Sequence, residues 1–227
     1  MSELDYTNNM NLRETYKLVG KLASGIYRDE ISLLKSLVSD IVDDPEFEII
    51  GGRIWECIPE EKCYKLQFQY GKMSHIPDGY SLKIEEQKEL FQKLTHERTF
   101  LNRETDLLLR EKGIEIYSVT AVGELLKIGD EKYYQYAIGF HAPEILQSFY
   151  ETLTVISSVA GIALRDLNAQ LDKEKITQDI IQASEIQKNL LPEHNIEFHD
   201  YKIFGICIPD SAVGGDFFDY LKQTDDE

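Results

Sequence analysis

Residues 47–71 read FEIIGGRIWECIPEEKCYKLQFQYG, and this stretch decides the fold. Residues 47–58 and 63–71 are two runs rich in β-branched and aromatic residues, and the short polar turn PEEK lies between them. This arrangement predicts a β-hairpin. Cys57 and Cys63 face each other across the expected turn. Because nothing in the sequence indicates export, we expect small buried thiols there rather than a disulfide.

The chain before the hairpin reads as helical. Gly25 is expected to separate two helices within residues 8–43. The second of them has apolar residues at spacings of three and four, the period of a helix with one buried face. These residues are Ile31, Leu34, Leu37, Val38 and Ile41.

Strands and helices continue after the hairpin. The predicted elements are a strand at 80–84, a helix at 85–98, a helical turn ending at Gly113, and strands at 114–123 and 132–140. The polar residues 124–131 are expected to form a connector with a turn at Gly129 and Asp130. This order predicts an α+β fold, an antiparallel sheet with flanking helices.

The next segment, residues 143–191, is predicted to form one long helix. Pro143 suits the first turn of a helix, and Pro192 ends the run. Its apolar stripe consists of Leu146, Phe149, Leu153, Ile156, Ala160, Leu164, Leu167 and Leu171, and resumes as Ile176, Ile180, Ala183, Gln187 and Leu190. Because a small domain cannot bury so long a stripe, we expect a second copy of the chain to cover it, as a homodimeric coiled coil through 143–191. The alternative is two helices broken near residue 173.

Composition limits the classes of partner. The chain has 227 residues and a formal net charge of −17. This charge repels phosphate backbones, so no nucleic-acid partner is expected. It suits a basic protein partner or divalent cations, or it serves solubility alone. No export signal is visible, and the longest nearly uncharged stretch is too short to span a bilayer. We therefore expect a cytoplasmic protein without membrane insertion.

The C-terminal segment predicts two more strands, at residues 201–209 and 213–220. Two strands cannot form a domain on their own. Either they pair with another chain or the natural protein continues past residue 227, and we expect the second.

The second of these strands, VGGDFFDY, contains the candidate metal ligand. In a strand, Asp216 and Asp219 point to opposite faces, so they are not expected to share one ion. Gly214 and Gly215 have no side chains and leave room beside Asp216 for an ion or a phosphate. Asp216 is therefore the candidate. A lone carboxylate needs further oxygen ligands to hold a divalent cation.

Two segments resemble the opening of bacterial PPM-type serine/threonine phosphatases related to SpoIIE and RsbU. The family pattern is A-x-x-I-Q-x-x-L-L-P, then a strand, then V-G-G-D-[FY]-[FY]-D. Its first part is matched by Ala183, Ile186, Gln187, Leu190, Leu191 and Pro192. Its second part is matched by Val213, Gly214, Gly215, Asp216, Phe217, Phe218 and Asp219. Asp210 departs from the small residue that the family usually has after the proline.

The resemblance implies a metal-dependent protein phosphatase. Asp216 would be a ligand of a Mn²⁺ or Mg²⁺ pair whose activated water attacks phosphoserine or phosphothreonine directly. The family's next metal motif, D-G-x-G, would lie beyond residue 227. The catalytic set is thus incomplete here, and we expect these 227 residues alone to be inactive. The implied substrate of the full-length parent is a phosphoserine regulatory protein, an anti-sigma-factor antagonist in sigma-factor partner switching.

Residues 28–165 resemble a GAF domain, a sensory fold, in element order and length. The implied organisation is a GAF-like sensory domain at 1–165, a linker helix at 166–192 and the truncated start of the phosphatase domain at 193–227. Aromatic residues on the strands either line a pocket for an unknown small-molecule signal or belong to the core. They are Trp55, Tyr64, Phe68, Tyr70, Tyr117, Tyr133, Tyr134 and Tyr136. His96 and His141 stand alone and are expected to be surface or satisfied polar residues.

Three functions remain open. The first is the regulatory N-terminal part of a PPM-type phosphatase, in which a signal at the sensory domain changes the helix pair and then the metal site. The alternative is a ligand-sensing GAF dimerisation module with no catalytic role. The third is a purely structural scaffold. A D-G-x-G segment encoded after residue 227 would favour the first.

Overall fold

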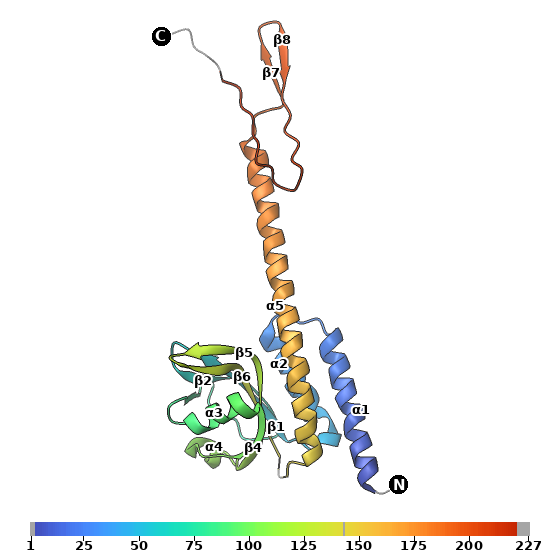
Figure 1. Ribbon diagram of the computed structural model, residues 1–227, viewed down its shortest axis with the longest axis vertical. Coiled ribbons are helices and arrows are strands. Elements are labelled where there is room, and N and C mark those ends of the chain that lie inside the picture. The colour runs from blue at the N-terminus through green and yellow to red at the C-terminus, as the bar shows by residue number, and fades with distance from the viewer. Residues whose placement is uncertain (1–2, 143, 222–227) are drawn as a thin grey trace. The chain divides into compact units, whose positions relative to one another are not determined.

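The computed structural model describes residues 3–142 and 144–221 (Figure 1). The chain forms two compact units, of which the first ends at Asn168 and the second begins at Ala169. Helix α5, Gln147–Leu190, contributes residues to both units. Within the described residues, no helix combines the length and the apolar character needed to cross a membrane.

The first unit is built on a six-stranded antiparallel sheet with the strand order β3-β2-β1-β6-β5-β4. Its strands are β1 Gly51–Ile58, β2 Cys63–Gly71, β3 Ser81–Lys83, β4 Thr99–Arg103, β5 Ile116–Ile128 and β6 Glu131–His141. The predicted hairpin is confirmed, with Cys57 opposite Tyr64 and Ile58 opposite Cys63. Both hairpin cysteines are free and buried. The first strand begins later than predicted because Pro45–Phe47 form a 3₁₀ turn.

The helices of this unit are α1 Glu3–Ser24, α2 Glu30–Asp43, α3 Lys88–Glu97 and α4 Leu107–Glu111. The two predicted N-terminal helices and the apolar stripe of the second are confirmed. A capping box begins α2, in which the Asp29 side chain accepts from the backbone N–H of Ser32. Gly52 lets α2 approach the sheet, because a Cβ there would lie 2.6 Å from a methyl group of Val38.

The two faces of the sheet carry separate hydrophobic cores. Along β6, Tyr136 and Ile138 point into the core that α1, α2 and α5 cover. Ala137, between them, points into the other core, which α3 and α4 cover (Figure 1). This follows from the alternation of side chains along a strand. Strand β6 therefore contacts the long helix through one face and the small helices through the other.

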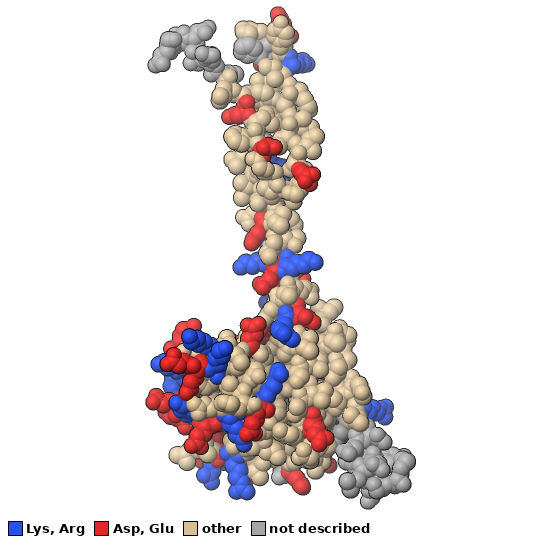
Figure 2. Space-filling view, in the orientation of Figure 1, with Lys and Arg blue, Asp and Glu red and all other residues tan. Residues whose placement is uncertain are grey.

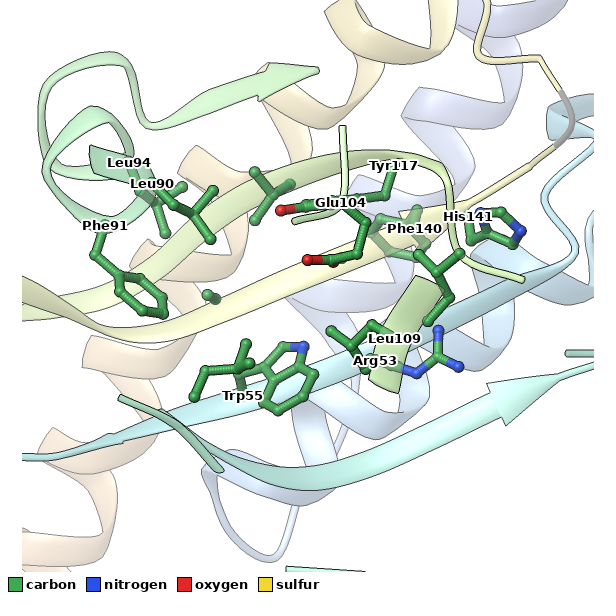
Figure 3. Close-up of a pocket in the computed structure, with 15 residues that line it drawn as sticks. Arg53, Trp55, Leu90, Phe91, Leu94, Glu104, Leu109, Tyr117, Phe140 and His141 are labelled. Atoms are coloured by element: carbon green, nitrogen blue, oxygen red, sulfur yellow. The ribbon is translucent and has the colours of Figure 1, made fainter. Parts of the chain in front are cut away.

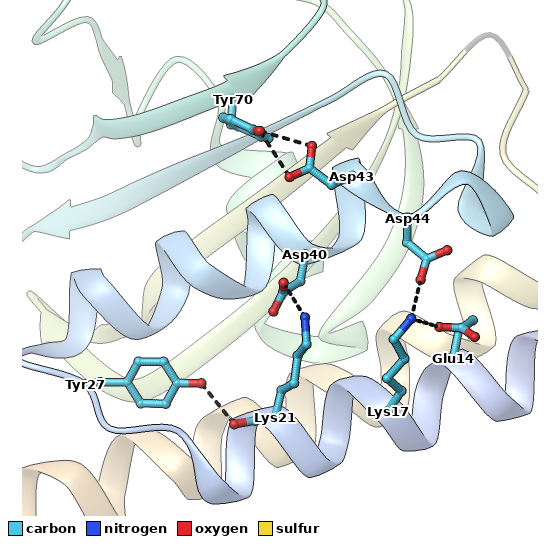
Figure 4. A network of polar contacts seen from close by, with 8 residues as sticks. All are labelled: Glu14, Lys17, Lys21, Tyr27, Asp40, Asp43, Asp44 and Tyr70. Carbon is cyan, nitrogen blue, oxygen red and sulfur yellow. Dashed lines mark hydrogen bonds and ion pairs between the residues drawn. The ribbon is translucent and has the colours of Figure 1, made fainter.

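Polar contacts fix α1 against α2 (Figure 4). Lys21 Nζ lies 2.7 Å from Asp40 Oδ1. Lys17 Nζ lies 2.8 Å from Glu14 Oε2 and 3.6 Å from Asp44 Oδ2. Exposed ion pairs contribute at most about 1 kcal/mol each, so they orient α1 more than they stabilise it. On the face of the first unit seen in Figure 2, basic and acidic side chains are interspersed.

One expectation for the sheet was wrong, and one strand was missed. Residues 124–131 are not a polar connector, because β5 continues to Ile128 and pairs with β6 up to Ile128 and Glu131. The predicted turn at Gly129 and Asp130 is correct, and so tight a turn requires the strands to run up to it. Strand β4 was not predicted; it pairs with β5 from Thr99 opposite Thr120.

Helix α5 is continuous, so the alternative break near residue 173 is wrong. It begins at Gln147 rather than at 143, and the predicted role of Pro143 lies outside the described residues. Its buried stripe ends at Leu167, and the distal apolar residues Ile176, Ile180, Ile186 and Leu190 are exposed in the single chain. The coiled-coil dimer stays a prediction.

The second unit contains a small hairpin of β7 Asn195–Phe198 and β8 Tyr201–Phe204. The strand predicted at 201–209 thus ends at Phe204, and β7 was not predicted. The strand predicted at 213–220 is wrong, because these residues form bends and irregular structure. The backbone of Gly214 bonds to a side chain of α5 instead of to a neighbouring strand. The argument that strand alternation separates Asp216 from Asp219 therefore does not apply.

Candidate functional site

A cavity of about 50 Å³ lies in the core covered by α3 and α4 (Figure 3). Strands β1, β5 and β6 form its floor, and helix α3 covers one end. The lining residues are Arg53, Trp55, Leu82, Leu90, Phe91, Leu94, Glu104, Leu109, Ile114, Tyr117, Val119, Ala137, Gly139, Phe140 and His141. Apolar residues thus dominate the wall, with a few polar groups among them, which is the usual composition of a small-molecule site.

The apolar end is formed by Trp55 from β1 and by Leu90, Phe91 and Leu94 from α3 (Figure 3). Phe91 is held in place by the ring of Tyr64, which stacks on it at 4.2 Å between centroids. Trp55 is 7% exposed. A rigid aromatic wall of this kind can pack against an apolar ligand group with little loss of side-chain entropy.

The polar end is centred on Arg53. Arg53 and Trp55 are two residues apart on β1, so the strand turns both side chains to the same face. Arg53 is 5% exposed, and its Nη2 donates to the Ser74 carbonyl at 3.0 Å. Its Nε has no hydrogen-bond partner among the described residues. Burial lowers the pKa of the guanidinium to about 10.

Glu104 and Tyr117 complete this end of the cavity (Figure 3). Glu104 Oε1 accepts from the backbone N–H groups of Thr105 at 2.8 Å and Asp106 at 2.9 Å. Burial nevertheless raises the pKa of the Glu104 carboxyl, and the charge of Arg53 opposes the rise only in part. The Tyr117 hydroxyl accepts from Asn102 Nδ2 at 3.0 Å, which leaves its own proton to be donated.

His141 lies at the same end of the cavity (Figure 3). Its Nδ1 lies 2.9 Å from the carbonyl oxygen of Ile116, so Nδ1 must carry the proton. In the neutral ring, Nε2 is then an acceptor. The sequence predicted no site role for His141, whereas the structure places it in the cavity wall.

The structure separates the predicted strand aromatics into groups. Trp55 and Tyr117 line the cavity, as the pocket interpretation expected. Tyr64 and Tyr133 belong to the core around the cavity, and Tyr134 packs against that core. The other three lie elsewhere: Tyr136 and Phe68 in the opposite core, and Tyr70 at the surface.

Sequence reasoning missed Arg53 and Glu104. A signal for Arg53 was present, because a lone arginine in the apolar run GGRIWECI shares a face with the tryptophan two residues on. No comparable signal existed for Glu104, since the strand β4 that leads to it was not predicted.

The predicted metal ligand Asp216 lies in the second unit. It is exposed, and it borders an apolar groove formed with residues of α5 and with Val213 and Phe217. Among the described residues, no three His, Cys, Asp or Glu side chains are grouped as a metal ion would require. These residues therefore do not fit a cation pair by themselves, and metal binding by Asp216 stays a prediction.

The same unit brings the two parts of the sequence motif together. Gln187 of α5 donates from Nε2 to the Gly214 carbonyl at 2.7 Å. The Gly214 N–H donates back to Gln187 Oε1 at 2.9 Å. One side-chain amide thus binds the backbone of Gly214 as a neighbouring strand would.

Comparisons with known proteins support the fold of the first unit. No family model matches the chain, and no curated protein matches it. Among solved structures, the bacteriophytochrome RpBphP3 from R. palustris is similar at a TM-score of 0.55, with 10% identity over 79% of this chain and 42% of that one. JSC1_58120g3 with bound biliverdin IXa is similar at a TM-score of 0.51, with 11% identity over 67% of this chain and 98% of that one.

A further similar structure is the GAF domain from an Acinetobacter phosphoenolpyruvate-protein phosphotransferase, with a TM-score of 0.47 and 12% identity over 74% of this chain and 97% of that one. The first unit has a GAF-like α+β fold, a six-stranded antiparallel sheet with flanking helices and a long C-terminal helix. Its likeness to the bacteriophytochrome and to JSC1_58120g3, at TM-scores of 0.55 and 0.51, supports the expected fold. At these identities the likeness concerns the fold alone.

Proposed function

We propose that the first unit is a small-molecule sensor that regulates an output through helix α5. The observation that carries this proposal is the buried guanidinium of Arg53, whose Nε lacks a partner among the described residues and lies in the cavity wall. An unpaired buried donor costs about 1–3 kcal/mol. A ligand that accepts a hydrogen bond from Nε would remove this cost.

Strand β6 offers a route from the cavity to α5. Ala137 and Gly139 of this strand line the cavity. On the other face, the Tyr136 hydroxyl donates to Glu30 Oε2 at 2.7 Å, and Asn168 Nδ2 of α5 donates to Glu30 Oε1 at 2.7 Å. One carboxylate thus joins the strand to the helix. A ligand that shifts β6 would change the contact that holds Asn168.

A second route runs through Arg98, the C-cap of α3. Helix α3 supplies three residues of the cavity wall. The Arg98 side chain donates to the Ala121 carbonyl at 3.3 Å and, from Nη2, to the Ser157 carbonyl of α5 at 3.4 Å. A movement of α3 on ligand binding would therefore change the hydrogen bond between Arg98 and the Ser157 carbonyl of α5.

The test uses Trp55, the single tryptophan of the chain, as the reporter. We expect some members of a panel of metabolites to change its fluorescence saturably in the wild type. Gly139→Ala, which adds a methyl group to the cavity wall, should abolish these changes. The proposal fails if no member gives a saturable change at millimolar concentration, or if Gly139→Ala binds every active compound as tightly as the wild type does.

A second candidate is the regulatory N-terminal part of a PPM-type serine/threonine phosphatase of the SpoIIE/RsbU kind. The supporting observation is the paired hydrogen bonding between Gln187 and Gly214, because these residues belong to the two parts of the motif. In this proposal Asp216 binds Mn²⁺ or Mg²⁺ together with ligands that the described residues do not supply. The substrate would be a phosphoserine protein, an anti-sigma-factor antagonist.

This candidate is tested on the complete natural polypeptide. We expect Mn²⁺-dependent release of phosphate from a phosphoserine protein, and a large loss of that activity in Asp216→Asn. Asp210→Asn, which changes a nearby acid outside the matched motif, is the control. Equal activity of Asp216→Asn and the wild type would exclude the assigned role. Absence of any phosphate release would leave the sensory module as the better description.

A further inference from the structure

The polar end of the cavity presents two opposite charges that are not directly paired. Arg53 and Glu104 interact electrostatically, yet no ion pair joins them among the described residues. Each is desolvated, and burial disfavours the charged form of both. A ligand with a net charge would attract one of these two groups and repel the other.

The donors and acceptors at this end are complementary to a zwitterion. Arg53 offers the N–H of Nε, which has no partner among the described residues. Glu104 offers carboxylate oxygen, since only its Oε1 is used by the two backbone N–H groups. Tyr117 can donate its hydroxyl proton to a ligand oxygen. A ligand with a carboxylate and an ammonium group would pair with both charges and bring in no net charge.

The rest of the cavity limits the ligand's body. Trp55, Phe91 and Leu94 bound it, and they favour an apolar group. The enclosed volume of about 50 Å³ has room for only a few non-hydrogen atoms, so it can take the apolar group of the ligand but not the whole ligand. The apolar group must therefore be a short aliphatic chain, and the charged groups of the ligand lie at the polar end beside Arg53 and Glu104.

We propose that the cavity binds a small zwitterion with a short apolar side chain, of which an aliphatic α-amino acid is the simplest case. The ligand's carboxylate accepts from Arg53 Nε, and its ammonium group donates to Glu104. This inference rests on the proposed sensory function, because it names the class of ligand for the same cavity.

The first test varies the ligand and leaves the protein unchanged. The probe is L-2-aminobutyrate, followed by the fluorescence of Trp55. Butyrate lacks its ammonium group, propylamine lacks its carboxylate, and 1-butanol lacks both. We expect L-2-aminobutyrate to bind at least about tenfold more tightly than any of the three, because only it satisfies both charges. Equal or tighter binding of butyrate, propylamine or 1-butanol would overturn the inference.

The second test varies the protein. Arg53→Met should weaken both L-2-aminobutyrate and butyrate by about tenfold or more, because it removes the carboxylate partner at similar side-chain length. Glu104→Gln should weaken L-2-aminobutyrate and propylamine but not butyrate. Arg103→Met, at an exposed position of β4 outside the cavity, is the matched control and should bind as the wild type does. Losses that do not follow this ligand-by-variant pattern would contradict the assigned contacts.

The outcomes separate this inference from the proposed function. If 1-butanol binds and Gly139→Ala abolishes it, while L-2-aminobutyrate does not bind, the cavity is a ligand site of another class and only the inference fails. If none of the probes or of the metabolite panel binds in a manner sensitive to Gly139→Ala, the sensory function fails as well.

Discussion

Gly139 lines the cavity, so a side chain added at this position tests the cavity through the stability of the protein. Among the described residues, a Cβ built on this glycine has one neighbour within 4 Å, the Tyr117 ring carbon Cδ2 at 4.0 Å. Gly139 lies inside β6 and pairs with Arg53 of β1 and with Val119 of β5. Gly139→Ala therefore places a methyl group in the space that a ligand would occupy, without a steric clash.

The expected change in stability can be worked from these facts. Glycine inside a strand costs about 0.5–1 kcal/mol relative to alanine, because it loses more backbone freedom on folding. Burying one additional methyl group contributes about 0.8 kcal/mol more. Gly139→Ala should thus raise the free energy of unfolding by about 1.5 kcal/mol, or raise Tm by about 3–6 °C for a unit of this size. It should at the same time abolish ligand binding.

The assay is urea unfolding followed by the fluorescence of Trp55, which lies in the first unit and so reports on that unit alone. Gly129→Ala is the matched control. Gly129 has open space around its Cβ position, but its φ of +63° is unfavourable for alanine, so we expect a loss of about 1 kcal/mol. The same chemical change should therefore have opposite signs at the two positions. A destabilised Gly139→Ala would show that the space beside Tyr117 is not available, and the cavity argument would be refuted.

Three further predictions concern other parts of the chain. Gly161→Ala should raise the free energy of unfolding by less than the roughly 1 kcal/mol expected from helix propensity, because the new Cβ would lie 3.1 Å from Arg98 Nη2. In a double-mutant cycle measured by urea unfolding, the same substitution should give the full increase in the Arg98→Ala background. An equal increase in both backgrounds would contradict the contact. Gln187→Met removes both hydrogen bonds to Gly214, which together contribute about 1 kcal/mol, so hydrogen exchange of the Gly214 N–H should become about fivefold faster or more. An unchanged exchange rate would show that the Gln187 side chain does not hold this segment. Burial raises the pKa of Glu104 above its unfolded value, so its contribution to stability is present at low pH and is lost as the pH rises from about 4.5 through the raised pKa; the stability of Glu104→Gln relative to the wild type should therefore increase over that range, and a parallel pH profile would contradict the buried carboxyl.

The sequence predicted the parts of the fold that depend on local pattern. The hairpin at 47–71 was recognisable because its turn is short and its strands are rich in β-branched and aromatic residues. The continuity of α5 was recognisable because its apolar spacing resumes after the charged segment. Strand β4 was not, since Thr99–Arg103 is a short edge strand whose stability depends on pairing with β5. Its local pattern alone is too weak to identify it.

The segment around Asp216 shows a different limit. Its glycine pair and aromatic residues read as a strand, but a strand requires a partner for its backbone. The partner of Gly214 is the side chain of Gln187, and the β7–β8 hairpin lies between these two residues in the sequence. Composition cannot reveal that a glutamine amide takes the place of a neighbouring strand. Gln187 and Gly214, which belong to the two parts of the motif, are hydrogen-bonded to each other, whereas the strand expected at residues 213–220 was wrong.

The alternation of side chains along β6 connects the cavity with the helix. Ala137 and Gly139 face the proposed ligand, whereas Tyr136, on the other face of β6, donates to the Glu30 carboxylate that also accepts from Asn168. A strand in the middle of a sheet cannot move one face without moving the other, because its backbone is bonded on both sides to β1 and β5. A ligand that draws Arg53 and Glu104 together would therefore displace β6 together with β1, and the contact between Glu30 and Asn168 is the place where α5 would respond. If hydrogen exchange in α5 near Asn168 is the same with and without bound ligand, the cavity and the helix are not coupled.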